Sequence, residues 1–212
     1  CGSGNFLIIT YKELRVLEIE IIKKIIELSD GNVLNAFASQ IKISQFYGIE
    51  IDDFAHEIAT LSLWLAEHQM NIIFEERLFE FAQVVSILPL KSIANIVQGN
   101  STRLNWEYVC PISETDEVYV IGNPPFEGSR GQVENQKDDL KVVFREDYKN
   151  LDYVSAWFYK GVQYIENKNA KCAFVSTNSI CQGLQVALLW KRIFSFNVEI
   201  NFAYRSFKWK NN

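Results

Sequence analysis

The sequence has few side chains that could hold a metal ion. Its 212 residues include two histidines and four cysteines, and no two cysteines form a Cys-x-x-Cys pair. His56-Glu57 begins like the zinc motif His-Glu-x-x-His, but Thr60 stands where the second imidazole would be needed. We therefore expect no metal site and predict that His56 is an ordinary helix-surface residue.

The sequence also lacks signals for an oxidising compartment or a membrane. The cysteines are Cys1, Cys110, Cys172 and Cys181. Without a paired spacing they are interpreted as reduced thiols, which predicts a cytoplasmic protein. The most apolar stretch, residues 6–28, is interrupted by charged residues from Lys12 to Lys24, so we predict no membrane-spanning segment.

An excess of positive charge is absent as well. Lysine and arginine number 21 against 26 aspartates and glutamates, which gives a net charge of −5. A chain that gripped nucleic acid by its overall charge would be basic, so any affinity for DNA must come from a local patch or another domain. The apolar share of 48% and the charged share of 22% are typical of a globular domain with a sizeable core.

Helical and extended segments alternate along the chain. Residues 6–28 form the first predicted helix, which Asp30-Gly31-Asn32 ends, and its apolar face is predicted to consist of Leu14, Leu17, Ile21, Ile25 and Leu28. Further helices are predicted at 52–70, 153–165 and 184–194. Extended segments are predicted at 41–51, 95–101, 117–126 and 171–180. Residues 127–141 are interpreted as a mobile loop, and Asp52 or Asp53 suits the start of the second helix as its cap.

This order predicts an α/β fold. Strands that alternate with helices form a doubly wound, mostly parallel Rossmann-like sheet, and the alternating tail 198–209 adds an antiparallel hairpin at the C-terminal end. In such sheets ligands bind at the carboxyl ends of the strands. The stretches that we place at this edge are 1–6, 50–53, 99–101 and 123–126. We expect the active site there.

Two of these stretches together indicate a nucleoside ligand. Gly2-x-Gly4 alone is a weak signal, since a glycine pair usually marks only a tight turn. With glycines that let the backbone come close, the carboxylate of Glu50 can accept both hydroxyls of a ribose. Ile51 could then cover one face of an adenine, or it could be a core isoleucine.

The sequence "VYVIGNPPFEGSRG" (118–131) carries the most specific signal. Proline cannot donate to a sheet ladder, so Pro124 and Pro125 end the strand and stiffen the chain after it. The side-chain oxygen of Asn123 and the carbonyl of Pro124 are then two acceptors suited to an amino group. Phe126 offers a flat face for a planar base, although a plain turn with a buried Phe126 is the simpler alternative.

The Asn-Pro-Pro-Phe motif downstream of these signals resembles the class I S-adenosylmethionine-dependent DNA methyltransferases of the adenine-N6 type, with the motif order called γ. The stretches "SQFYGIEIDDFAHEIATLSLWLAEHQMN" and "NFAYRSFKW" are similar to the methyltransferase region of single-chain type II restriction–modification enzymes of the MmeI kind. The resemblance covers essentially the whole chain, 1–212, as one catalytic domain.

The resemblance implies a role for each matching residue. Lining of the methionine and ribose of S-adenosylmethionine is implied for Gly2, Ser3, Gly4 and Phe6, ribose binding for Glu50 and adenine packing for Ile51. Asn100 stands where the family usually has an aspartate for the cofactor's adenine amino group. The target base is implied to meet Asn123, Pro124, Pro125 and Phe126. Contacts with DNA are implied for Phe202, Tyr204 and Phe207, and phosphate contacts are assigned to Arg130 and Lys137 unless they lie in a plain solvated loop.

The implied reaction is direct methyl transfer to the N6 amino group of an adenine flipped out of double-stranded DNA, as part of a restriction–modification system. The family motif normally begins with a strand and Asp-Pro ahead of the Cys-Gly-Ser-Gly with which this chain starts. We therefore expect the first strand to be truncated and cofactor binding by these residues alone to be weakened or absent. A target-recognition region is expected elsewhere in the same polypeptide, and the sequence leaves open whether a nuclease region is there too.

Two alternatives remain open at this point. Asn-Pro-Pro-Phe-type motifs also serve enzymes that methylate the guanine N2 of ribosomal RNA or the glutamine amide of release factors, because each presents a planar NH₂ group. The other alternative is an inactive methyltransferase fold that acts as a DNA-binding scaffold.

Overall fold

The computed structural model describes residues 1–29, 37–82 and 94–207. The chain divides into two compact units, Cys1–Asn100 and Ser101–Asn212, and each is described by itself. Within the described ranges, no helix is both long enough and apolar enough to cross a membrane.

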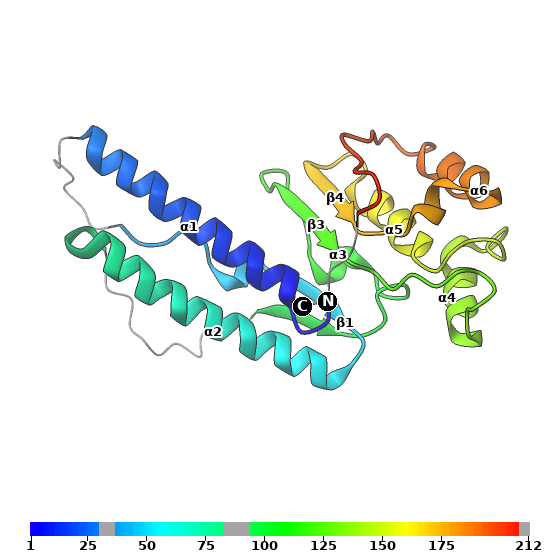
Figure 1. Cartoon of the computed structure of the whole chain (residues 1–212), viewed down its shortest axis with the longest axis horizontal. Coiled ribbons are helices and arrows are strands. Elements are labelled where there is room, and N and C mark those ends of the chain that lie inside the picture. Colours follow the sequence, from blue (N-terminus) through cyan, green and yellow to red (C-terminus); the bar gives the residue numbers. More distant parts are fainter. Residues whose placement is uncertain (30–36, 83–93, 208–212) are drawn as a thin grey trace. The chain divides into compact units, whose positions relative to one another are not determined.

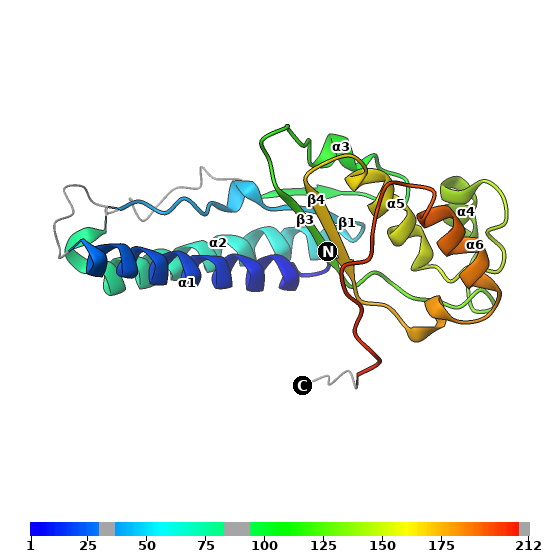
Figure 2. The ribbon, with the colours of Figure 1, turned by 90° about the horizontal axis from the view of Figure 1, so that it is seen from above.

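The first unit contains two long helices and a pair of parallel strands. Its elements are α1 (Asn5–Leu28), a 3-10 turn (Ile43–Gln45), β1 (Tyr47–Glu50), α2 (Asp53–Leu78), a second 3-10 turn (Phe79–Phe81) and β2 (Asn95–Gln98). The helices α1 and α2 lie side by side (Figures 1 and 2). Strands β1 and β2 pair in parallel, with Glu50 opposite Gln98 at their carboxyl ends. The predicted helix is confirmed, and the extended segments predicted at 41–51 and 95–101 are strands only over 47–50 and 95–98. The predicted stop at 30–32 lies outside the described residues.

The predicted apolar face of α1 was wrong. The side chains of Leu14, Leu17, Ile21, Ile25 and Leu28 are all exposed. The buried stripe of α1 consists of Tyr11, Arg15, Ile19 and Ile22. Apolar residues occur around most of this helix, so spacing alone could not select the packed side, and a charged residue in the buried stripe hid it from the pattern.

Arg15 is buried, and both of its Nη atoms find hydrogen-bond partners inside the unit, whereas its Nε forms no hydrogen bond and lies 3.5 Å from Glu18 Oε2. One guanidinium nitrogen, Nη1, donates to the Tyr11 hydroxyl, and both Nη atoms donate to Asn71 Oδ1 on α2 at 3.0 Å. The guanidinium also lies over the Phe74 ring, 5.4 Å from its centre. Buried charges are tolerated when paired in this way, and the contacts fix α1 against α2.

Helix α2 begins where the sequence indicated and runs eight residues beyond the predicted end at 70. The Asp52 side chain accepts a hydrogen bond from the Ala55 N–H at 2.8 Å, so Asp52 is the cap. The buried side chains of α2 recur at steps of three and four, namely Ala59, Leu63, Ala66, Met70, Phe74 and Leu78. This stripe faces α1 and the strand pair.

The second unit places helices around another parallel pair. Its elements are α3 (Trp106–Val109), β3 (Val118–Gly122), α4 (Glu134–Phe144), α5 (Ser155–Ile165), β4 (Ala170–Phe174), a 3-10 turn (Asn178–Cys181) and α6 (Leu184–Ile193). Strand β3 pairs with β4 from Val118 opposite Ala170 to Gly122 opposite Phe174. Buried Leu140, Leu151 and Leu189 belong to the core shared by α4, α5 and α6.

The interpretation of residues 127–141 as a loop was wrong for its second half, which is helical in α4. The helix is mostly polar, so its periodicity is weak in the sequence. It is held by burial of Leu140 and Phe144 and by the buried carboxylate of Asp139, which accepts hydrogen bonds from the Tyr153 hydroxyl and the Arg103 Nε, both at 2.7 Å. Burial and the Asp139 bond raise the pKa of Tyr153 well above its usual value.

The antiparallel C-terminal hairpin is not confirmed, because residues 198–207 contain no strand. Alternation predicts which side chains would share a face once a strand has a partner, but it does not supply that partner. The parallel pairings are confirmed, and the doubly wound arrangement is not. The positions 208 and 209 of the predicted tail lie outside the described residues.

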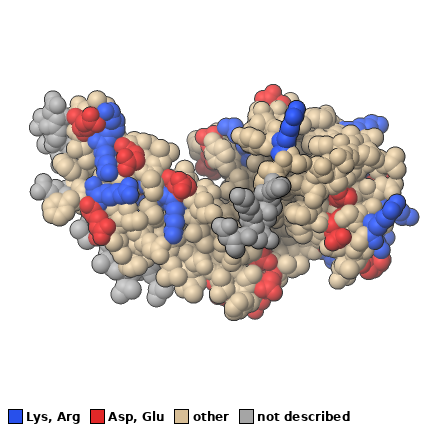
Figure 3. All heavy atoms as spheres, viewed as in Figure 1, with Lys and Arg blue, Asp and Glu red and all other residues tan. Residues whose placement is uncertain are grey.

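The surface of the α1–α2 pair carries charges of both signs, which Figure 3 shows intermixed on the face in view. Close pairs include Lys24 with Glu27 at 2.8 Å and Lys23 with Glu20 at 3.3 Å. Exposed pairs of this kind contribute little to stability, roughly 0.2–1 kcal/mol each. This face is therefore not a basic surface.

Candidate functional site

The glycine turn (residues 1–4) folds tightly at the start of α1. The Gly4 N–H donates to the Cys1 carbonyl at 3.2 Å, and both Gly2 and Gly4 have positive φ values, 59° and 82°. A Cβ on Gly4 would lie 3.2 Å from the Ala59 Cβ of α2, so glycine is required for conformation and for space. On β1, a Cβ on Gly48 would lie 3.1 Å from the Cys1 Sγ, so the missing side chain there lets the turn approach the strand.

The carboxylate of Glu50, at the carboxyl end of β1, is surrounded by N–H donors. Its Oε2 forms an ion pair with the terminal ammonium group of Cys1 at 2.7 Å and accepts a hydrogen bond from the Gly2 N–H at 2.5 Å. Its Oε1 accepts from the N–H groups of Ile51 at 2.9 Å and Asp52 at 3.0 Å. A carboxylate offers about four acceptor directions, so all of them are in use.

These contacts keep Glu50 ionised. Burial alone would raise its pKa, but the hydrogen bond from the terminal ammonium of Cys1, the N–H groups of Asp52 and Gly2, and the positive charge of that ammonium outweigh burial and lower the pKa from 4.5 to about 2. Glu50 is therefore a carboxylate at neutral pH, paired with the Cys1 ammonium beside the glycine turn.

The structure brings three of the sequence-predicted stretches together in the first unit. The Gly99 N–H donates to the Glu50 carbonyl at 2.7 Å, which places Asn100 beside the end of β1. The side chain of Ile51 is 66% exposed, so it is not a core isoleucine and is available to cover a ligand. Phe6 is 38% exposed on the first turn of α1, and Ser3 is exposed, with its hydroxyl 3.4 Å from Asn5 Oδ1.

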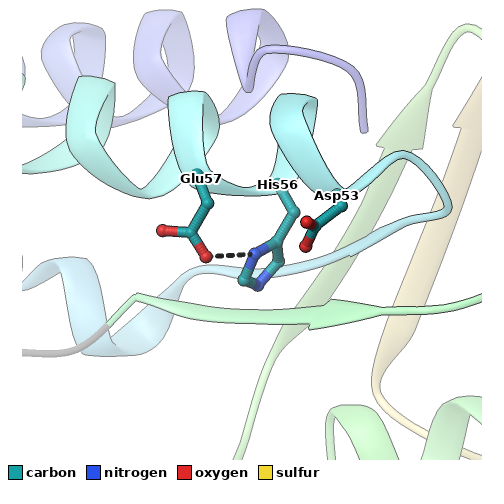
Figure 4. A group of neighbouring side chains, drawn as sticks. All are labelled: Asp53, His56 and Glu57. Atoms are coloured by element: carbon teal, nitrogen blue, oxygen red, sulfur yellow. Dashed lines mark hydrogen bonds and ion pairs between the residues drawn. The ribbon is translucent and has the colours of Figure 1, made fainter.

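Near this site, helix α2 carries a group of side chains that could hold a metal ion: Asp53, His56 and Glu57. Their possible ligand atoms lie within 4.8 Å of one another. Figure 4 shows Glu57 turned toward His56 Nδ1, at 3.1 Å. The other ring nitrogen of His56 lies 3.0 Å from the Ile96 carbonyl of β2. His56 is thus a link between α2 and β2, more than the surface residue we predicted, and both nitrogens are engaged.

In the second unit, the Asn-Pro-Pro-Phe turn follows β3 directly. The Val175 N–H donates to the Gly122 carbonyl at 3.0 Å, so the last rung of the β3–β4 ladder immediately precedes Asn123. Asn123 and Pro125 are exposed and Pro124 is buried. Phe126 is 46% exposed, so the alternative of a buried ring in a plain turn is wrong.

Hydrogen bonds hold the chain after this turn in place. The Glu127 carbonyl accepts from the Tyr153 N–H at 2.8 Å and from Gln132 Nε2 at 3.2 Å. The Gly131 N–H donates to the Gly128 carbonyl at 2.9 Å, which closes a tight turn that carries the exposed Arg130. The segment from 127 to 132 is therefore an ordered turn.

The other side chains that we predicted to contact DNA are exposed. Lys137 lies on α4, with Glu134 at 3.8 Å, and Arg130 lies on the turn before that helix. Phe202, Tyr204 and Phe207 are 67%, 86% and 64% exposed. The rings of Phe202 and Tyr204 meet edge to face with centres 5.6 Å apart, which is a small aromatic surface facing solvent.

Comparison with known proteins identifies the family. The MmeI DNA-methyltransferase domain family matches residues 1–212, the whole chain. The chain belongs to this family. The resemblance predicted from the sequence is thereby confirmed.

Two proteins that are similar to this MmeI-type domain support the family assignment. DNA methyltransferase A of Bacillus subtilis (strain 168) is 54% identical over 215 residues, a match that covers 100% of this chain and 24% of the relative. A solved structure of the type IIL restriction–modification enzyme MmeI in complex with DNA has a TM-score of 0.88 and 43% identity, and the match covers 100% of this chain and 28% of the MmeI chain. The chain thus spans about a quarter of the length of the relatives it matches.

Within the MmeI-type domain, the sequence-based prediction missed the polar side chains that follow β4, at the strand end next to the Asn-Pro-Pro-Phe turn. We predicted a strand over 171–180, but β4 ends at Phe174. The polar segment Val175–Ser179 therefore continues beyond the same carboxyl edge from which Asn123 emerges. The run of serine, threonine and asparagine at 176–179 was the signal that could have ended the strand earlier.

Proposed function

We propose that the chain is the catalytic domain of a DNA methyltransferase that moves the methyl group of S-adenosylmethionine to the exocyclic N6 of adenine. The observation that carries this proposal is the position of Asn123-Pro124-Pro125-Phe126 at the carboxyl end of β3, with Asn123 and Phe126 exposed. Membership of the MmeI methyltransferase domain family supports the DNA-methylating part of the proposal.

The residues of the first unit fit the cofactor chemically. S-adenosylmethionine supplies an electrophilic methyl group on a sulfonium when it is bound. Glu50 is the ribose-binding residue in this proposal, and ribose hydroxyls are donors like the N–H groups that the carboxylate already accepts. Because the four acceptor directions are in use, the hydroxyls would replace the Cys1 and Gly2 nitrogens on Oε2. Ile51 is exposed and is proposed to cover the adenine. Asn100 follows Gly99, whose N–H donates to the Glu50 carbonyl, and is proposed to accept from the adenine amino group.

The second unit supplies the groups that prepare the acceptor nitrogen. The lone pair of an adenine amino group is delocalised into the ring, so this nitrogen is a poor nucleophile. Hydrogen bonds from its two N–H groups to the Asn123 Oδ1 and the Pro124 carbonyl would favour a pyramidal nitrogen with a localised lone pair. In this mechanism no side chain removes a proton beforehand, and the rate depends on position and electrostatics.

The acceptor base has to leave the duplex before it can reach this turn, at a cost of a few kcal/mol. The half-exposed ring of Phe126 is placed to stack on the flipped base, and the aromatic residues Phe202, Tyr204 and Phe207 are further stacking candidates. Arg130 and Lys137 are proposed to contact phosphates. Since the chain is acidic overall, we propose that other domains of the same polypeptide recognise the target sequence and supply most of the DNA affinity, and that the protein serves a restriction–modification system.

Methylation assays with the full-length protein test the proposal. Labelled S-adenosylmethionine is supplied with duplex DNA, ribosomal RNA or release factor, and modified adenines in the DNA are mapped. We expect N6-methyladenine at defined sites in DNA and no transfer to the other two. Label in ribosomal RNA or release factor, or none in DNA, would contradict the proposal.

A matched pair of variants links the activity to the turn. Asn123→Ala should abolish transfer while the thermal unfolding midpoint stays unchanged, because Asn123 is exposed. The control is Asn169→Ala, an exposed asparagine immediately before β4, at the opposite end of the strand pair. It should retain full activity, and equal losses in both variants would disconnect the turn from the reaction.

A further inference from the structure

We propose that Asp152 is a positioning residue that fixes the Asn-Pro-Pro-Phe turn for the reaction, and that Ser179 and Gln185 hold Asp152 in place. The inference rests on the function proposed above for that turn. It assigns a role in the reaction to three polar side chains from different parts of the second unit.

The turn needs anchoring from outside because of its own sequence. Pro124 and Pro125 have no N–H group, so neither can be fixed by donating a backbone hydrogen bond. The anchors that the structure provides immediately after Phe126 are at Glu127 and Gly128. Whatever holds these two residues therefore sets the place of the Phe126 ring.

The segment around Asp152 meets that part of the chain. The Tyr153 N–H, directly after Asp152, donates to the Glu127 carbonyl at 2.8 Å. A Cβ built on Gly128 would lie 3.7 Å from Asp152 Oδ1, so this carboxylate oxygen lies on the side of Gly128 where a side chain would stand. Asp152 and Tyr153 thus lie beside the two residues that follow Phe126.

Asp152 is in turn held by two side chains. Its Oδ2 accepts hydrogen bonds from the Ser179 hydroxyl and from Gln185 Nε2, the latter at 3.0 Å. The Asp152 N–H donates back to Gln185 Oε1 at 3.2 Å, and Gln185 Nε2 also donates to the Ser179 carbonyl at 2.6 Å. Gln185 is buried, and such a network of polar groups keeps each member in one orientation.

The network also joins the two strand ends. Ser179 follows β4, its hydroxyl lies 2.6 Å from that of Thr177, and β4 pairs in register with the strand that delivers Asn123. A shift of the segment after β4 would thus be transmitted through Asp152 to Glu127 and Gly128. Because misplacement of reacting groups by about 1 Å can cost on the order of a hundredfold in rate, this network is placed to control the methyl-transfer rate.

Kinetics of the full-length protein test the inference with the variants Asp152→Ala, Asp152→Asn and Ser179→Ala. We expect Asp152→Ala to lower kcat by about 10–100-fold, with the KM values for S-adenosylmethionine and DNA within about threefold of wild type, which corresponds to less than about 1 kcal/mol. Asp152→Asn, which keeps the shape and one oxygen for Ser179 and Gln185, should recover part of kcat. The kcat of Ser179→Ala should lie between the kcat values of Asp152→Asn and Asp152→Ala.

A spectroscopic readout separates positioning from general destabilisation. DNA with 2-aminopurine at the target adenine fluoresces when that base is unstacked. We expect Asp152→Ala to bind this DNA normally and to give an altered emission intensity, because the base no longer stacks on a fixed Phe126. The control is Tyr164→Phe, which removes one hydrogen bond to the Cys110 carbonyl, at 2.7 Å, elsewhere in the same unit. It should leave kcat and the fluorescence unchanged.

The outcomes distinguish this inference from the proposed function. If the wild-type protein methylates adenine but Asp152→Ala keeps kcat within twofold, the positioning role is wrong and the proposed function stands. If Tyr164→Phe lowers kcat as much as Asp152→Ala does, the effect is structural and the inference is also wrong. If Asp152→Ala does not fold, Asp152→Asn and Ser179→Ala decide by the same criteria. A wild-type protein that does not methylate adenine overturns both.

Discussion

The Oε2 atom of Glu50 accepts the backbone N–H of Gly2, 48 residues earlier in the chain. This contact joins the carboxyl end of β1 to the turn that begins α1. It places an ionised carboxylate and a glycine-lined backbone next to each other, the two features that suit a ribose-bearing ligand at the edge of a parallel sheet. The contact also makes Glu50 a structural residue as well as a candidate ligand-binding residue.

Replacing Glu50 by glutamine should therefore affect both binding and folding. The amide NH₂ of Glu50→Gln would face N–H donors, and a buried unsatisfied donor costs about 1–3 kcal/mol. We expect the free energy of unfolding to fall by that amount and the affinity of the full-length protein for S-adenosylmethionine to fall at least about tenfold, or 1.4 kcal/mol. Urea unfolding and titration calorimetry measure the two effects. Glu13→Gln, an exposed position on α1, is the control and should change neither.

The low pKa of Glu50 predicts a pH dependence of stability. Its pKa is lowered from 4.5 to about 2 in the folded chain, so its contribution is present above pH 4.5 and is lost as the pH falls toward 2. The stability difference between wild type and Glu50→Gln should therefore shrink across this window. Urea midpoints of both proteins, compared between neutral pH and about pH 3, check it. A difference that stays constant would show that Glu50 is not the group responsible.

Two isoleucines of α1 test which face of the helix is packed. Ile19 is fully buried and Ile21 is 51% exposed. Ile19→Ala should lower the free energy of unfolding by about 2–5 kcal/mol, the usual cost of a cavity in a core. Ile21→Ala should change it by less than about 0.5 kcal/mol. Denaturant unfolding of the two variants measures both values, and the reverse order would restore the face that the sequence predicted.

Gly161 on α5 is predicted to tolerate no side chain. A Cβ there would lie 2.9 Å from a ring atom of Phe174 and 3.4 Å from the Cys172 Sγ, both on β4. Alanine favours helix formation, but overpacking typically costs about 1–3 kcal/mol, so we expect Gly161→Ala to destabilise the chain on balance. Thermal unfolding measures the change. In the full-length protein kcat should fall too, because β4 carries the segment that holds Asp152.

The sequence predicted the elements that have strong local signals. The helix at α1 and the strand before Asn123 follow from apolar spacing and from proline's missing N–H, which are properties of neighbouring residues. The cap at Asp52 was also predictable, because the short side chain of aspartate reaches the N–H groups of the turn that follows. Helix α4 was missed because it is mostly polar and depends on Asp139, Leu140 and Phe144 meeting partners elsewhere.

The candidate site divides in the same way. Glu50 and the Asn-Pro-Pro-Phe turn were found because each stands at a strand end marked by its own residue type. Asp152 was not found, since it lies in a segment with no motif and its role depends on Ser179, 27 residues later, and on Gly128, before α4. A predicted strand end at Phe174 would have revealed the polar residues 176–179, but not that Asp152 is the partner of Ser179.

The amino-acid sequence by itself determined where the chain can be helical, where it must leave a strand, and which chemistry the Asn123–Phe126 turn presents. These follow from the backbone freedom and hydrogen-bonding groups of residues next to one another. The tertiary structure decided which side of α1 is buried, which donors surround Glu50, and what holds the turn in place. Those features depend on contacts between residues far apart in the chain. Such contacts form only when tertiary packing buries one of several helix or strand faces that the local sequence does not distinguish.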